Sequence, residues 1–195
     1  MDATRQAFLD ELYAHGRAHD EQREDRLQRL RNVEPETAEL LGVLVRAMDA
    51  RRVLEIGTSN GYSTIWLADA VLETGGAVLS LEIEAERTGQ ALANLTRAGV
   101  KGAAELRTQD AAEALPAFDA ESWELIFLDA ERPAYTGYWP DLLRVLVPRG
   151  LLVVDNALSH AKELVDFSEL VYGTEGVTST LLTVGAGVLL AVKSG

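Results

Sequence analysis

The segment VLEIGTSNGYS, residues 53–63, carries the pattern that decides the fold. A short apolar run ends at Gly57, as a buried strand does, and Gly61 precedes the helix-forming run YSTIWLADAVLE. Glycines in such a turn let backbone amides approach a ligand at the helix N-terminus. The spacing is not GxGxxG, so the dinucleotide fingerprint is absent. The segment predicts a strand, a ligand-binding turn and a helix.

The same alternation of strand and helix continues towards the C-terminus. We expect strands at residues 75–84, 103–110, 124–129 and 150–156, with helices at 85–99, 111–118, 139–150 and 159–173. Residues 177–192 predict a hairpin that turns at Gly185–Gly187. This order indicates an α/β fold: a doubly wound, mostly parallel, Rossmann-like sheet with helices on both faces and a C-terminal antiparallel hairpin.

The N-terminal part predicts helices. Residues 2 to about 31 are rich in helix formers with few apolar positions, and Pro35 opens a second helix. We expect one domain, residues 1–195, of which residues 1–31 form a helical N-terminal extension.

The composition excludes several classes of function. A formal net charge of −13 disfavours nucleic acid and anionic membrane surfaces as partners. The absence of cysteine excludes disulfides, thiolate zinc sites and a cysteine nucleophile. We find neither a signal-peptide pattern nor a run of about 20 apolar residues, so we expect a cytoplasmic protein.

Two acidic residues follow the strands next to the glycine segment. Glu82 ends the next strand, where acids in doubly wound sheets accept hydrogen bonds from ribose hydroxyls. Asp110, in TQDA, also ends a strand and could recognise an adenine amine. The alternatives are that acids near Glu82 begin a helix and that Asp110 is a helix N-cap.

The ordered set VLEIGTSNGYS, LEIE, TQDA, IFLDAE and LLVVDN resembles the S-adenosylmethionine-dependent O-methyltransferases that act on catechols and caffeoyl-coenzyme A. The resemblance runs from about Asn32 to the C-terminus and implies S-adenosylmethionine as cofactor, a phenolic acceptor and a homodimer. It implies that the glycine segment surrounds the methionine part, Glu82 binds the ribose and Asp110 with Ala111 faces the adenine. The cofactor-binding set it implies is Val33, Glu55, Gly57, Thr58, Ser59, Gly61, Ser63, Glu82, Ile83, Asp110, Ala111 and Asp129.

A candidate metal site lies at two further strand ends. Asp129 follows ELIFL, and Asp155 and Asn156 follow GLLVV. Two carboxylates and an amide oxygen form an all-oxygen set that suits Mg²⁺, with Ca²⁺ or Mn²⁺ as alternatives. Such a cation favours ionised vicinal hydroxyls and orients one of them for methyl transfer. The alternative is that these residues only stabilise turns.

The proton acceptor is the least defined part of the site. Arg132 stands where the similar proteins usually carry a lysine that acts as general base, and arginine does not release its proton. Arg132 could orient a substrate oxygen or bind a carboxylate. His160 is the candidate base, although a histidine near a helix start is also an ordinary capping residue. Tyr135, Tyr138 and Trp139 suit either an aromatic pocket or packing.

The expected function is cation-dependent methylation of a small catechol-like phenol. The alternatives are a metal-independent methyltransferase with Arg132 binding an acidic acceptor, a nicotinamide oxidoreductase, and a non-catalytic S-adenosylmethionine-binding module. The incomplete glycine fingerprint and the TQDA element count against the oxidoreductase.

Overall fold

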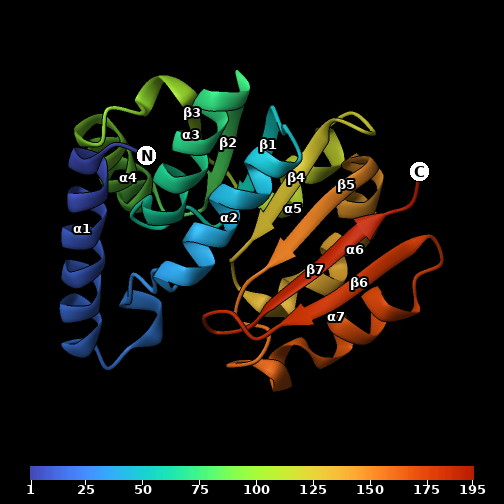
Figure 1. The fold of residues 1–195 in the computed structure, drawn as a ribbon. Coiled ribbons are helices and arrows are strands. Elements are labelled where there is room, and N and C mark those ends of the chain that lie inside the picture. The colour runs from blue at the N-terminus through green and yellow to red at the C-terminus, as the bar shows by residue number, and fades with distance from the viewer.

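The computed structural model describes residues 1–195, apart from the side chain of Leu27. Its centre is a sheet with the strand order β3-β2-β1-β4-β5-β7-β6 (Figure 1). The strands are β1 (Arg52–Ile56), β2 (Ala77–Glu82), β3 (Ala104–Thr108), β4 (Trp123–Leu128), β5 (Leu146–Val154), β6 (Val177–Leu182) and β7 (Val188–Lys193). The helices are α1 (Ala3–Glu21), α2 (Pro35–Ala47), α3 (Tyr62–Thr74), α4 (Ala85–Arg97), α5 (Ala111–Ala114), α6 (Tyr135–Val145) and α7 (Ala161–Gly173), with short 3₁₀ turns η1 (Arg26–Gln28), η2 (Lys101–Ala103), η3 (Leu115–Ala117) and η4 (Arg132–Ala134).

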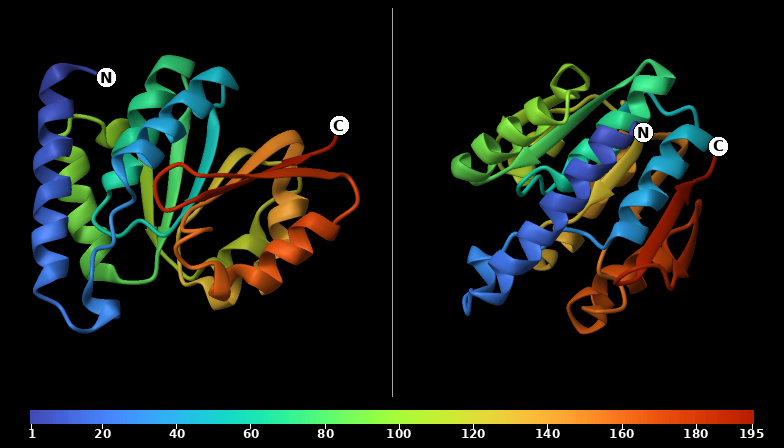
Figure 2. Two further views of the ribbon diagram at one scale, coloured as in Figure 1. Left: turned by 60° about the horizontal axis from the view of Figure 1, so that its bottom comes forward. Right: turned by 60° about the vertical axis from the view of Figure 1, so that its left-hand side comes forward.

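Helices cover both faces of the sheet. Alternate residues of each strand point to opposite faces, so each face has its own core. Val53 of β1 packs in the core that holds side chains of α1 to α4, and Leu54 packs in the core that holds side chains of α5 to α7. The two further views show these layers on either side of the strands (Figure 2). None of the described helices is long and apolar enough to cross a membrane.

The predicted fold class is confirmed. β1 pairs in parallel with β2 and β4, and β4 pairs in parallel with β5. The predicted hairpin is also present, with β7 antiparallel to both β5 and β6. Gly185 and Gly187 have φ values of 52° and 91°, which explains glycine at the turn between β6 and β7.

The order of the strands reverses direction at β1. The chain passes from β1 outward through β2 to β3, and then returns to β4 on the other side of β1. Doubly wound sheets bind ligands outside the carboxyl ends of the strands at such a reversal, because the connections diverge there. The topology therefore places the site at the ends of β1, β2, β4 and β5.

The predicted long N-terminal helix is wrong beyond Glu21. The carboxylate of Asp20 accepts hydrogen bonds from the backbone N–H groups of Leu30 and Arg31, at 2.7 and 2.8 Å, and so folds the following chain back against α1. Arg31 adopts φ +51°, a conformation that no helix contains. Residues 29–34 therefore form an irregular connection that leads to α2.

The boundary between α6 and β5 also differs from the prediction. The helix begins at Tyr135 and ends at Val145, and the strand begins at Leu146, although a helix was expected to continue to residue 150. Pro148 and Arg149, the latter with φ +66°, lie in the first half of β5, where the pairing with β4 shifts register. A local irregularity of this kind tolerates proline inside a strand.

Candidate functional site

Gly57 and Gly61 shape the turn at the end of β1. Gly57 has φ +105°, and a Cβ atom there would lie 2.2 Å from the carbonyl oxygen of Asp129. Gly61 is the N-cap of α3 with φ +84°, and a Cβ atom there would lie 3.0 Å from Cβ of Ala91. The turn therefore needs glycine at both positions for conformation and for space. It leaves the N-terminus of α3 at the edge of a cavity that Gly57 and Ser59 line.

Glu82 holds this turn from the neighbouring strand. One of its carboxylate oxygens accepts the backbone N–H of Ser59 at 2.8 Å, and the other accepts the backbone N–H of Glu84 at 3.0 Å. The side chain is buried and lines the cavity. Ile83, by contrast, is 67% exposed and presents an apolar surface at the same end of the cavity. A ligand there would meet one carboxylate and one apolar side chain.

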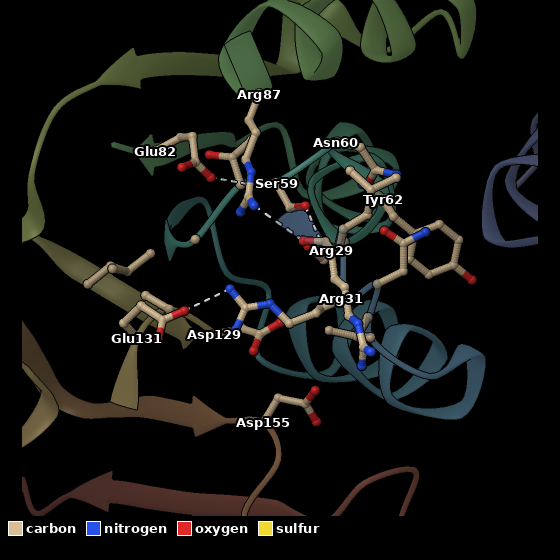
Figure 3. A pocket seen from close by; sticks show the side chains of 18 of the residues that line it. Arg29, Arg31, Ser59, Asn60, Tyr62, Glu82, Arg87, Asp129, Glu131 and Asp155 are labelled. Atoms are coloured by element: carbon tan, nitrogen blue, oxygen red, sulfur yellow. Dashed lines mark hydrogen bonds and ion pairs between the residues drawn. The ribbon is translucent and has the colours of Figure 1, made fainter. Parts of the chain in front are cut away.

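The connection between α1 and α2 covers the glycine turn. Ser59 Oγ donates to the carbonyl oxygen of Leu30 at 2.7 Å, and Arg87 of α4 donates to that of Arg29 at 3.2 Å. Figure 3 shows Ser59, Arg87 and Arg29 close together in the wall of the cavity. Val33, which the sequence placed over the cofactor, is buried and lines the same cavity. We call residues 29–33 the strap.

Glu55 lies behind the turn and does not line the cavity. Its carboxyl group is fully buried and accepts hydrogen bonds from the hydroxyls of Ser63, Thr64 and Ser80. Burial raises the pKa of Glu55 to about 7, although the three hydroxyl donors act in the opposite direction. Thr58 is buried as well, with its hydroxyl against that of Ser80. Glu55 therefore ties the first turn of α3 to β1 and β2.

We expect the stability of the protein to fall as pH rises from 4.5 to about 7, because folding keeps a proton on Glu55 that the unfolded chain has lost. The pKa of Glu55 is higher in the folded state, so the folded state binds more protons in this window. The loss amounts to about 3 kcal/mol. Glu55→Gln should reduce this slope in chemical unfolding measured across the window, whereas the exposed Glu113→Gln should keep it. Asp129 and Asp155, whose pKa values are also raised, contribute the slope that remains. Equal slopes in Glu55→Gln and in the unchanged protein would contradict the assignment.

Asp110 and Ala111 lie at the far end of the cavity. Asp110 is the N-cap of α5, and its carboxylate accepts the backbone N–H of Ala112 at 2.8 Å. Both residues, together with Gln109, line the cavity. Asp110 is therefore a helix N-cap, as the alternative interpretation predicted. Its second carboxylate oxygen remains available to a ligand.

The three residues of the candidate metal set come together at the edge of the sheet. The backbone N–H of Asp129 donates to Ile56, and that of Asp155 to Leu128, so the strand pairing continues to these residues. Asn156 Nδ2 donates to Asp129 Oδ1 at 3.1 Å and to Asp155 Oδ2 at 3.0 Å. Asp155 Oδ1 is buried and accepts no hydrogen bond from the part of the chain that the structure describes.

The charges of Arg31 and Arg132 only partly offset the burial of these two carboxyl groups. Burial raises the pKa of Asp129, and burial together with the charge of Asp129 raises the pKa of Asp155. The amide of Asn156 is the donor between them. No cluster of three or more His, Cys, Asp or Glu side chains suited to a metal occurs among the described residues, so the set is two carboxylates and an amide.

Arginines surround the end of the cavity where Asp129 lies. Arg132 is only 4% exposed, and its Nε donates to Glu163 of α7 at 2.8 Å. Arg26 contacts both Glu163 and Glu131, and Arg31 of the strap reaches Glu131 at 2.8 Å. Figure 3 shows the Arg31–Glu131 pair beside Asp129. The ion pairs join the strap and η1 to the loop after β4 and to α7.

His160 is the N-cap residue of α7 and lines the cavity. Its Nδ1 lies 2.9 Å from the hydroxyl of Ser159. Burial and the nearby charge of Arg132 lower the pKa of His160, so its neutral form is favoured at neutral pH.

The aromatic residues after Asp129 divide between packing and the cavity. Tyr135 and Trp139 are buried, each in an edge-to-face contact with Phe167. Tyr135 Oη also hydrogen-bonds the backbone N–H and C=O of Ala130. Tyr138 lines the cavity. Tyr135 and Trp139 therefore pack in the core, and of these three aromatic residues only Tyr138 is available to a ligand in the cavity.

One cavity of about 820 Å³ connects these groups. Of the residues that the sequence singled out, Gly61 and Glu55 do not line the cavity. Those that do are Val33, Gly57, Thr58, Ser59, Ser63, Glu82, Ile83, Asp110, Ala111, Asp129, Arg132, Tyr138, Asp155, Asn156 and His160. Sequence reasoning missed Leu30, Arg31, Asn60 and Arg87. The positions of Leu30 and Arg31 depend on how the strap folds back, which no local motif indicates.

Comparison with known proteins assigns the chain to a family. A sequence model of the O-methyltransferase family matches residues 8–194. The chain belongs to the O-methyltransferase family. The family match includes most of α1, so the resemblance extends further towards the N-terminus than the motifs from Asn32 onward.

Individual O-methyltransferases support this assignment. Catechol O-methyltransferase of Niastella koreensis is 36% identical over 136 residues, which span 68% of this chain and 61% of that protein. The chain thus matches about six tenths of this relative's length. The O-methyltransferase TomG of Streptomyces achromogenes, solved with SAM, is 30% identical with a TM-score of 0.79, covering 100% of this chain and 91% of that one. The O-methyltransferase of Bacillus cereus, solved with SAH, is 28% identical with a TM-score of 0.78, covering 100% and 92%.

Proposed function

We propose that this protein transfers a methyl group from S-adenosylmethionine to a hydroxyl group of a small catechol-like phenol, with the help of a divalent cation. The observation that carries the proposal is the meeting of the glycine turn, Glu82 and the Asp129–Asp155–Asn156 set in one cavity. The solved structures from Streptomyces achromogenes and Bacillus cereus are complexes with SAM and SAH, and the Niastella koreensis relative is a catechol O-methyltransferase. These names support the choice of methyl donor and of acceptor.

The cofactor half of the cavity fits a nucleoside with an amino-acid tail. Glu82 offers a carboxylate for the ribose hydroxyls, while Asp110 and Ala111 lie at the end proposed for the adenine, next to exposed Ile83. The methionine part would lie against the glycine turn and the N-terminus of α3, where backbone amides favour a carboxylate. The strap then covers this half.

The acceptor half fits a divalent cation. Asp155 Oδ1 is a buried oxygen without a partner among the described residues, and Asn156 supplies only an amide dipole between two carboxyl groups. Asp129, Asp155 and the amide oxygen of Asn156 would hold Mg²⁺, Ca²⁺ or Mn²⁺. When bound, the cation would supply the positive charge that favours the ionised form of the acceptor.

The protein contributes orientation and proton handling. The contact between Gly57 and the backbone of Asp129 fixes the methyl-donor half close to the acceptor half. His160, whose pKa is lowered, is neutral and can take up the acceptor's proton at Nε2. Methyl transfer breaks the carbon–sulfur bond of the sulfonium and forms a carbon–oxygen bond, leaving a neutral thioether and a neutral aryl ether.

The test combines binding with turnover. The purified protein should bind S-adenosylhomocysteine in calorimetric titration and methylate catechol in the presence of Mg²⁺, and a chelator should abolish methylation until the cation is restored. Methylation that survives the chelator would favour the metal-independent alternative. Binding without turnover of any phenol in a panel would favour a non-catalytic cofactor-binding module. Failure to bind S-adenosylhomocysteine would contradict the proposal itself.

A homodimer remains part of the proposal. The apolar side of α1 is used within the chain, because Phe8, Leu9 and Leu12 are buried and Arg97 lies over the Phe8 ring at 4.4 Å. Any contact between two copies through α1 would therefore use its exposed polar side.

A further inference from the structure

The side chain of Arg132 is buried but only partly satisfied. Its Nε donates to Glu163, whereas Nη2 is buried and has no hydrogen-bond partner among the described residues. A buried guanidinium donor without an acceptor is costly, so such a group in a cavity wall indicates a ligand oxygen. Arg132 is part of the wall that also contains Asp129 and His160.

Arg132 is the buried member of a cluster of ion pairs. Three arginines, Arg26, Arg31 and Arg132, share two glutamates, Glu131 and Glu163. Asp129 is a third carboxyl group near Arg31 and Arg132. Since Arg26 and Arg31 are partly exposed and Arg132 is not, the charge of Arg132 is the least screened by water.

The titratable groups near Arg132 come from three parts of the fold. Asp129 and Glu131 follow β4, Tyr135 lies in α6, and Glu163 belongs to α7, whose N-cap is His160. Glu163 fixes the direction of the guanidinium through Nε. Arginine keeps its proton at any pH at which the protein is folded, so Arg132 can stabilise an anion but cannot accept a proton.

We propose that Arg132 donates a hydrogen bond to the reacting oxygen of the acceptor and so holds the bound phenol as a phenolate. The assignment rests on the proposed function, which it makes more specific: weakly acidic phenols also react, and the rate depends less on the acidity of the acceptor than it would without Arg132. The bond from Arg132 holds the oxygen in its anionic form until the carbon–oxygen bond forms, and the proton has by then left to His160 or to water.

The test uses 4-nitrocatechol, because its phenol and phenolate differ in colour. Complexes of the full chain with S-adenosylhomocysteine and Mg²⁺ are titrated with pH in the unchanged protein, in Arg132→Met and in Arg132→Lys. We expect the apparent pKa of the bound phenol to rise by about one to two units in Arg132→Met, as for loss of a charge-assisted hydrogen bond. Arg132→Lys keeps the charge and should give an intermediate value.

Matched controls separate this effect from unfolding and from general charge. Arg107→Ala removes the same charge from β3, outside the cavity, and should leave the pKa of bound 4-nitrocatechol unchanged. Thermal unfolding and S-adenosylhomocysteine affinity report whether Arg132→Met is folded. If this variant fails to fold, Arg132→Lys is compared with the unchanged protein instead. Loss of the planar guanidinium group should still raise the pKa of bound 4-nitrocatechol.

Turnover provides a second measurement. Methylation rates of catechols bearing nitro, ester, hydrogen or methyl substituents should fall more steeply with acceptor pKa after Arg132→Lys or Arg132→Met than before. The assignment is overturned if a folded Arg132→Met shows the same bound pKa and the same dependence, or if it loses only acceptors that carry a carboxylate. Absence of methylation by the unchanged protein would instead contradict the proposed function.

Discussion

Asp155→Asn is expected to lower cation-dependent methylation of catechol by about 10³-fold, because it removes one of the two proposed carboxylate ligands of a cation that supplies several kcal/mol of charge stabilisation. The substitution keeps the size of the side chain. The affinity for S-adenosylhomocysteine should stay within about 3-fold of the unchanged value, since that affinity depends on the other half of the cavity. Rates measured over a range of Mg²⁺ concentrations check the first expectation, and calorimetry checks the second.

The stability of Asp155→Asn should move in the opposite direction from its activity. Asp155 is buried against Asp129, and one of its oxygens has no partner among the described residues, so in the metal-free protein its charge is a liability. The free energy of unfolding without metal should therefore not decrease. Asp166→Asn, an exposed position on α7, is the matched control and should change neither property. Full Mg²⁺-dependent activity in Asp155→Asn would place the cation elsewhere or remove it from the mechanism.

Gly57→Ala is expected to destabilise the protein by about 4 kcal/mol or more, which is at the upper end for a single substitution. A Cβ atom would lie 2.2 Å from the backbone oxygen of Asp129, and Gly57 has φ +105°. A backbone atom cannot turn aside as a flexible side chain can. The ends of β1 and β4 would have to separate, and both halves of the cavity would change shape.

Gly99→Ala separates the two components of this effect. Gly99 also has a positive φ, +72°, but a Cβ atom there would meet nothing within 4 Å. It should therefore lose only about 1 kcal/mol, the conformational part. Chemical unfolding of both variants gives the comparison. A loss at Gly57 no larger than that at Gly99 would mean that the close approach to Asp129 is readily relieved.

The sequence was sufficient to predict which residues lie at the edge of the sheet. Asp129 and Asp155 directly follow apolar runs, and the order of elements makes those strands neighbours, so their meeting followed from topology alone. Glu82 could be placed in the same way from the strand before it. These predictions needed only the position of each acid relative to a strand end.

The strap and the role of Glu55 could not be predicted from the sequence in the same way. The end of α1 depends on Asp20 reaching residues 30 and 31, a contact between side chain and backbone that helix propensity does not contain. Glu55 lies two residues before Gly57, but its side chain points to the face covered by α3, where three hydroxyls donate to it. Such orientations depend on packing in three dimensions.

The strap touches both halves of the cavity at once. Leu30 accepts a hydrogen bond from Ser59 on the side of the methyl donor, and Arg31 is paired with Glu131 on the side of the acceptor. A ligand that shifts the strap from one side would therefore also change the other side. By thermodynamic linkage the two binding events are coupled reciprocally, so whatever factor the donor contributes to acceptor affinity, the acceptor returns to the donor.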